Sequence, residues 1–392
     1  MELKARGMKN VKWFLAVCSI LSLLVGCSPD IKEISDIDLV LATGIDYDKE
    51  SNKYVFTIYC VLPASTSTEK TGKLTELVDS AVGDSILDAA RNLRNRVGKS
   101  LVWQHNKFFI VGEAAARHSL YDVVDFLTRN RQIRITSQLL VSEGKAEDLL
   151  KRKSNISELT SNVLLGIVRN EKEWGKSYSL MIHKVADHYT NPYRGFVLGR
   201  IISSPKSVTS RSSLLLNGGA VINNGKFVDW LDGDDVRVVH WLSEKSKWNN
   251  YEFTETLEYK STKVTYFLQI SKREIHSVYV NGKPKLDVQL NFKATLGEMN
   301  QHLALSDPDI LAQLEEITSK HLEKIIRHSL KHFQQDLKVD LIGISDYFVR
   351  NHPNEWKNLK NDWVHVYPTM SIPVHVDVKI EKLGMTQIIG DQ

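Results

Sequence analysis

Cysteine is scarce in this chain of 392 residues, with only Cys18, Cys27 and Cys60. The first two lie within or directly after an apolar stretch near the start, so Cys60 is the only thiol in the rest of the chain. One thiol cannot form an intrachain disulfide. We therefore expect a fold held together by packing, with Cys60 as a small core side chain of a strand.

Long apolar runs are also missing. The run from Trp13 to Val25 is shorter than the roughly 20 residues that a membrane-spanning helix needs. No GxSxG, Walker A, GxGxxG, HExxH or CxxC motif occurs in a convincing context, and no nucleophile lies beside a base. We predict that the protein is not an enzyme and uses no cofactor.

Neither sign of charge dominates. The chain has 51 Lys and Arg against 47 Asp and Glu, a formal net charge of +4. Most of that excess lies in the first 26 residues, so the remainder is close to neutral. Bulk charge therefore gives no indication of nucleic-acid binding, and nucleic acid is not an expected partner.

What the chain does have is an export signal. Residues 1–26 combine a basic start, the short apolar run and small Gly26 before Cys27, as a secretory signal peptide does, with either Met1 or Met8 as the start. Leu24-Val25-Gly26-Cys27 also resembles the lipobox of bacterial lipoproteins, in which cleavage precedes a cysteine that receives diacylglycerol. We predict lipidation at Cys27, so that membrane lipid is a partner; the alternative is an ordinary signal peptide with an incidental cysteine.

The chain beyond Cys27 predicts an α+β or mixed α/β protein of several domains. Residues 27–200 alternate strand and helix patterns, and that length allows two subdomains. Turn formers in 191–213 mark the boundary. Residues 212–388 combine strands with the longest helix, roughly 307–335. We expect mixed sheets with packed helices and one long helix in the C-terminal domain.

Two Asn-Gly pairs predict tight hairpin turns, Asn224-Gly225 and Asn281-Gly282. Around the second pair, the pattern predicts three extended segments, 260–270, 274–281 and 285–293.

Histidines recur on one face of the predicted long helix. His328 and His332 are four residues apart, and His321 lies on the same face. Such a pair can chelate zinc, but no carboxylate or cysteine near them in the sequence completes a ligand set. We expect a solvated or interfacial histidine face without a metal.

Basic residues gather in "RNLRNRVGK" (91–99) and "RNRQIR" (129–134), on either side of "LVWQHNKFFIVGE" (101–113). An ordinary solvated face is the favoured explanation of these charges, and contact with anionic head groups is the alternative. His105 has no nucleophile beside it. We interpret these segments as a candidate interaction surface. Its residues are Arg94, Arg96, Trp103, His105, Lys107 and Arg131.

Together these segments resemble the Ger(x)C family of spore germination lipoproteins. The resemblance rests on the lipobox, "DIDLVLATGIDYD" (36–48), residues 97–150, "GGAVINNGKFVDWLD" (218–232), and residues 340–384 with Pro353 and Trp356 in a P-x-x-W arrangement. The family's G-x-x-x-W-x-H-x-K stretch has counterparts in Gly98, Trp103, His105 and Lys107, with Gly98 at a different spacing. Cys27 is followed by Ser-Pro-Asp where many members have Trp-Asp.

The resemblance implies a C subunit of a spore nutrient germinant receptor, required for receptor assembly and the germination response. It further implies an anchor on the outer face of the spore inner membrane, polytopic A and B subunits as partners, and no catalytic residues. Two other classes stay open: a substrate-binding lipoprotein that captures a small nutrient, and a membrane-tethered hydrolase.

Overall fold

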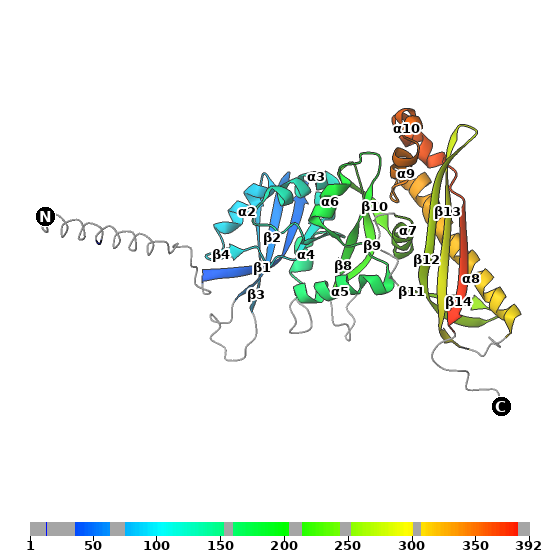
Figure 1. Ribbon diagram of the computed structural model, residues 1–392. Helices are drawn as coiled ribbons and strands as arrows, with labels where there is room; N and C mark the ends of the chain where they lie inside the picture. Colours follow the sequence, from blue (N-terminus) through cyan, green and yellow to red (C-terminus); the bar gives the residue numbers. More distant parts are fainter. Residues whose placement is uncertain are drawn as a thin grey trace, which may run out of the picture.

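The computed structural model describes residue 13 and residues 36–62, 75–152, 160–203, 214–243, 252–300 and 307–382 (Figure 1). The predicted lipidation site Cys27 and nearly all of the predicted signal peptide lie outside the described residues. Within those ranges, no helix is both long enough and apolar enough to cross a membrane.

A ten-stranded mixed sheet forms the first half. Its main path runs in the order β10-β9-β8-β6-β5-β1-β2-β3, with β4 added beside β1 and β7 beside β6. Pairing is parallel through the centre, from β1 to β5, β6 and β8, and antiparallel towards both edges. The strands are β1 (Ile37–Asp48), β2 (Lys53–Leu62), β3 (Thr75–Gly83), β4 (Ser100–Val102), β5 (Phe108–Gly112), β6 (Gln138–Ser142), β7 (Leu180–Met181), β8 (Phe196–Ser203), β9 (Leu214–Asn223) and β10 (Lys226–Leu231).

Helices cover both faces of this sheet. One face carries α2 (Ile86–Arg94), α3 (Glu113–Arg129) and α6 (Ile182–His188), whose apolar side chains share a core with β2. The other face carries α4 (Ala146–Leu150) and α5 (Thr160–Trp174). The central strand β5 is buried along its whole length, which explains its unbroken apolar sequence.

The large sheet continues across the predicted boundary at 191–213. β8 pairs antiparallel with β9, and β9 pairs with β10 through a turn in which Asn224 and Gly225 have φ of 48° and 75°. This confirms the first predicted Asn-Gly turn. α7 (Gly233–Leu242) follows and leads to the second sheet. The division into domains at 200–212 stays a prediction.

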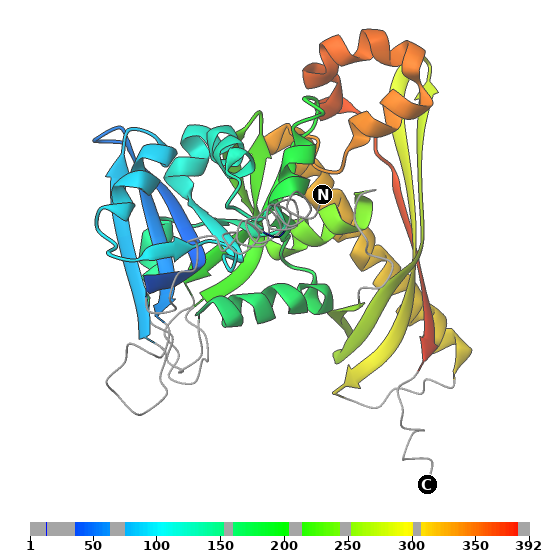
Figure 2. The ribbon, with the colours of Figure 1, turned by 60° about the vertical axis from the view of Figure 1, so that its left-hand side comes forward.

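The second sheet has four strands in the order β11-β12-β13-β14 (Figure 2). They are β11 (Glu252–Tyr259), β12 (Thr262–Val280), β13 (Lys283–Met299) and β14 (Val374–Lys382). One face packs on the long helix α8 (Pro308–Lys331), which continues through a π turn at His332–Leu337. The predicted long helix and the mixed α+β class are confirmed.

The predicted segments 260–270 and 274–281 are a single strand, β12, and not two. A bulge between Ile270 and Lys272 lets the pairing with β13 continue past the polar residues there. The strand then ends at Asn281-Gly282, where φ values of 53° and 75° confirm the second predicted turn.

Short helices gather beside the tip of the β12–β13 hairpin (Figure 2). They are α9 (Ile344–Asn351), α10 (Pro353–Leu359) and α11 (Trp363–Val366), with 3-10 turns at Lys360–Asp362 and Tyr367–Thr369. Phe348, Trp356 and Trp363 are buried there in the same core as β12 and α8.

Candidate functional site

A groove of about 860 Å³ lies between α2 and α3. Residues from β2, from both helices, from the segment after β4 and from the segment after α3 line it. Three of the predicted interaction residues, Arg94, Trp103 and Arg131, come together here although they belong to different segments of the chain.

Aromatic rings form the floor of the groove. Trp103 is only 7% exposed, and its ring centroid lies 5.8 Å from that of Phe56 on β2. Phe126 of α3 meets Phe56 edge-on at 6.0 Å. Trp103 thus contributes to this surface from beneath, as a buried ring under the groove.

A second aromatic group borders the groove at Tyr54 and His118. The His118 ring stacks on Tyr47 at 3.9 Å, and Tyr54 meets both rings edge-on. Burial, and secondarily the charges of Asp122 and Tyr47, raise the pKa of Tyr54 to about 12. The phenol therefore stays neutral at physiological pH.

Arginines line the rims of the groove. Arg91 and Arg94 belong to α2, and Arg131 follows α3. Arg129 is neutralised by Asp125, with its Nε 2.7 Å from the carboxylate. Among the residues that the structure describes, Arg94 donates only to the neutral Gln132 side chain, at 3.3 Å.

The other predicted interaction residues do not line the groove. Arg96 donates from Nη1 to the Ser80 carbonyl at 2.8 Å, which covers part of the outer edge of β3. His105 and Lys107 are exposed on the connection from β4 to β5. The basic run 91–99 contains Arg91, but the predicted interaction residues do not include it, although its spacing of three residues from Arg94 places both on one helix face.

Two histidines of the long helix bind different carboxylates. His321 Nε2 lies 2.9 Å from Glu255 Oε1, and His332 Nδ1 lies 2.8 Å from Asp235 Oδ2. His328 lies beside His332 at a surface hollow of about 400 Å³. Across the described ranges, no three His, Cys, Asp or Glu side chains are grouped to hold a metal ion.

Burial and these bonds shift the pKa of each of the two carboxylates in opposite directions. Burial would raise the pKa of Glu255, but its bonds to His321 and Arg237 lower it overall. At Asp235, burial raises the pKa although bonds from Ser329 and His332 act against it. Both pairings join elements far apart in the sequence, so local spacing could not reveal them.

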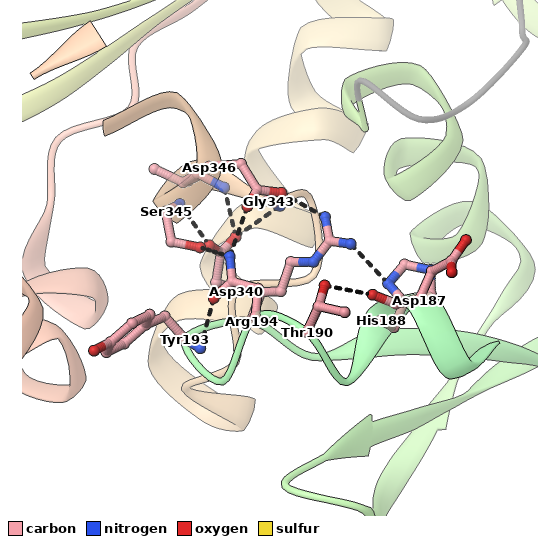
Figure 3. Close-up of polar contacts among 11 residues, drawn as sticks. Asp187, His188, Thr190, Tyr193, Arg194, Asp340, Gly343, Ser345 and Asp346 are labelled. Carbon is pink, nitrogen blue, oxygen red and sulfur yellow. Dashed lines mark hydrogen bonds and ion pairs between the residues drawn. The ribbon is translucent and has the colours of Figure 1, made fainter. Parts of the chain in front are cut away.

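A polar joint connects the α6–β8 segment to α9 (Figure 3). Arg194 donates from Nη1 to Asp346 Oδ2 at 2.6 Å and from Nη2 to His188 Nδ1 at 3.0 Å. A guanidinium can only donate, so Nδ1 of His188 is the acceptor. Asn191 Nδ2 donates to the other Asp346 oxygen at 2.6 Å.

Asp340 holds the start of α9 on the other side of the joint. The buried Asp340 carboxylate accepts the N–H groups of Gly343, Ile344 and Ser345 at the start of α9 (Figure 3). The Asp340 carbonyl accepts the Gly195 N–H at 3.0 Å. The two sheet-containing parts are therefore tied by main-chain as well as side-chain bonds.

Comparison with known families covers both halves of this architecture. The model described as "Spore germination protein N-terminal domain" matches residues 30–203, and "Spore germination B3/ GerAC like, C-terminal" matches residues 217–384. The chain belongs to the Ger(x)C family of spore germination proteins.

Relatives in this family match along nearly their whole length. Spore germination protein KC of Bacillus subtilis (strain 168) is 27% identical, over 95% of this chain and 96% of the relative. Spore germination protein B3 of the same organism is 23% identical, over 96% and 99%. The crystal structure of the GerBC protein matches with a TM-score of 0.58 at 19% identity, covering 90% of this chain and 100% of that chain, and so shares the fold.

The two family regions meet inside one sheet. The N-terminal region ends at the last residue of β8, and the C-terminal region begins within β9. Because β8 and β9 are hydrogen-bonded neighbours, strands from both family regions complete the ten-stranded sheet.

Proposed function

We propose that the protein is a lipid-anchored C subunit of a spore nutrient germinant receptor, on the outer face of the spore inner membrane. Membership of the Ger(x)C family across both halves of the chain carries this proposal. The lipobox ending at Cys27, directly after an apolar run with a basic start, supports the anchor.

The proposed anchor limits how far the folded part can move from the membrane. β1 begins at Ile37, ten residues after Cys27. Ten residues span at most about 35 Å when fully extended. Confinement to this layer raises the effective concentration towards a co-resident membrane protein, so an interface of modest affinity suffices for assembly.

In this proposal the protein binds membrane partners and turns over no substrate. The partners are the polytopic A and B subunits of the receptor. The interaction surface comprises the rims of the α2–α3 groove at Arg94 and Arg131 over Trp103, together with the neighbouring Arg96, His105 and Lys107. An exposed cationic rim over an aromatic floor supports a role in recognition.

Deletion of the gene in the spore-forming host tests the proposal. We expect loss of the nutrient response, failure of the A and B subunits to co-purify as a complex, and restoration of both by the wild-type gene. Full nutrient germination with normal levels of the partner subunits would contradict the receptor role. Turnover of a defined substrate by the purified protein, lost on changing one residue, would contradict the non-enzymatic role.

A further inference from the structure

The α2–α3 groove is lined by the carboxylates Asp84, Asp122 and Asp125 as well as by arginines. Within the part of the chain that the structure describes, Arg91, Arg94 and Arg131 form no ion pair with a carboxylate. In the described chain, carboxylates within 4.0 Å bind Arg129 at this groove and five arginines elsewhere, which are Arg117, Arg194, Arg200, Arg237 and Arg327. Arg96, Arg152 and Arg273 donate to neutral oxygens instead.

The chemistry below the cations is apolar. Phe56 and Trp103 are buried beneath the groove, and half-buried Phe126 borders it. Rings under a guanidinium rim suit a ligand that brings carboxylates to the rim and an apolar side chain to the floor. The unpaired lining carboxylate, Asp122, lies near Tyr54, so that end suits an uncharged part of the ligand.

The size and form of the groove indicate a chain segment. Its volume of about 860 Å³ is near the upper end of the roughly 300–1,000 Å³ typical of small-molecule sites. Small-molecule sites enclose most of their ligand, whereas this groove is about half open to solvent. A concave surface with its aromatic rings at the bottom also cannot lie flat against a bilayer.

We propose that the α2–α3 groove binds an extended acidic segment of a membrane partner. Its carboxylates pair with Arg91, Arg94 and Arg131, and one apolar side chain rests over Phe56 and Trp103. The inference rests on the proposed function only for the identity of the partner.

Photo-crosslinking of the full-length protein in its own membranes tests this inference. Leu87 lies in the groove wall with 47% of its surface exposed, so Leu87→p-benzoylphenylalanine places a reactive group at the site. Val364 of α11 is 72% exposed outside the groove and provides the control position. We expect the Leu87 probe to capture one segment rich in Asp and Glu, identified by mass spectrometry, and the Val364 probe to miss it.

Charge reversal then tests the pairing itself. Arg91→Glu combined with Arg131→Glu should reduce the crosslink by roughly tenfold or more, since like charges at an interface cost several kcal/mol. Arg134→Glu is the matched control, because Arg134 is exposed nearby but does not line the groove. Changing acids of the captured segment to Lys should restore the crosslink to the double variant.

Several outcomes would overturn the inference. They are capture of a neutral or basic segment, capture of lipid, no capture by a folded Leu87 probe variant, or a crosslink unaffected by charge reversal. Equal melting temperatures of the variants and the wild type establish that folding is intact. An acidic segment from a protein outside any germinant receptor would contradict the proposed function and leave this inference standing.

Discussion

Arg194 and Asp346 lie 152 residues apart in the chain and form a 2.6 Å ion pair at the joint between the α6–β8 segment and α9. The Arg194 side chain is 6% exposed and that of Asp346 is 31% exposed. Burial of the guanidinium makes this pair more consequential than a surface ion pair.

Arg194→Met should therefore destabilise the protein. It removes the donor to Asp346 and His188 and leaves the Asp346 carboxylate with Asn191 as its remaining partner there. We expect a loss of about 2–3 kcal/mol, below the 3–5 kcal/mol of a fully buried pair because Asp346 is partly solvated. Urea unfolding monitored by circular dichroism measures it.

Lys53→Met provides the control for that measurement. Lys53 pairs with Asp84 at 3.3 Å, but both side chains are exposed. Loss of this ion pair should lower the free energy of unfolding by no more than about 1 kcal/mol. Equal effects of the two substitutions would show that the joint contributes no more than a surface contact.

Features of this fold that depend on local residue chemistry were predictable from the sequence. Features that depend on pairing between distant strands were not. The Asn224-Gly225 and Asn281-Gly282 turns follow from residues that adopt positive φ, so the pattern identifies them directly. The pairing of β8 with β9 across the proposed boundary has no such local signal. The bulge that keeps β12 continuous depends on its pairing with β13.

The same distinction applies to the candidate site. Basic runs in the sequence indicated Arg94 and Arg131, but only the fold shows that Trp103 lies beneath them. The carboxylates that bind His321 and His332 come from β11 and α7, which are 66 and 97 residues away. Spacing along one helix could not reveal either partner.

Asp46 and Gly112 should behave as a coupled pair in stability measurements. The buried Asp46 carboxylate accepts the N–H groups of Ala146 at 2.8 Å and Glu147 at 2.9 Å, and so caps α4 from β1. A Cβ added to Gly112 would lie 1.8 Å from Asp46 Oδ1. Asp46→Ala and Gly112→Ala should each cost about 1–3 kcal/mol by leaving the cap unmade.

A double-mutant cycle checks that coupling. Because both changes remove the same cap, the double variant should lose much less than the sum of the two single losses. Additive losses would show that Gly112 acts independently of the Asp46 cap.

Glu171 should make stability depend on pH in a defined direction. Burial raises the pKa of its carboxyl from 4.5 to about 7, against the opposing bonds from Ser179. The folded protein then holds a proton between about pH 4.5 and 7 that the unfolded chain has released. This contribution to stability is therefore present at low pH and falls as the pH rises through that window.

His240, 3.8 Å from Glu171, has the opposite effect. Burial lowers its pKa to about 3, and its Nε2–H donates to the Ser177 carbonyl at 2.7 Å, so the ring is neutral and the contact is not an ion pair. As the pH falls, His240 binds a proton in the unfolded chain near pH 6.5, before it does so in the folded protein. This contribution to stability therefore rises with pH up to about 6.5. Between about pH 4.5 and 6.5, these two opposite pH dependences of stability largely cancel in the wild type.

Glu171→Gln separates the two contributions, because the amide resembles the protonated acid. Relative to the wild type, the variant should be about equally stable at pH 4.5 and more stable at pH 8, by about 2–3 kcal/mol. Urea midpoints across this range measure the difference. A difference that does not change with pH would contradict an elevated pKa at Glu171.

Metal removal should leave the fold unchanged. His321 and His332 are each bonded to a separate carboxylate, on β11 and α7, and these bonds hold the rings without a shared ion. We expect the same melting temperature with and without EDTA. A marked drop on chelation, restored by zinc, would indicate that these histidines or residues outside the described ranges bind metal.

Cys27→Ser should abolish the membrane attachment of the protein. Lipidation at this residue would supply acyl chains worth about 0.8 kcal/mol per buried CH₂, and stable anchoring requires more than one chain. The wild-type protein should therefore partition into detergent and carry diacylglycerol on its first residue. The variant should be released or keep its signal peptide, as shown by fractionation and mass spectrometry of the amino terminus.

The other two cysteines serve as controls for lipidation. Burial raises the pKa of Cys60 to about 12, so this thiol is protonated and inaccessible, and Cys60→Ala should leave lipidation intact. Cys18→Ser should likewise have no effect, because Cys18 follows bulky Val17 whereas Cys27 follows Gly26. A mature protein that begins elsewhere with an unmodified residue would refute the anchor, and the proposed receptor subunit would then need another means of reaching the membrane.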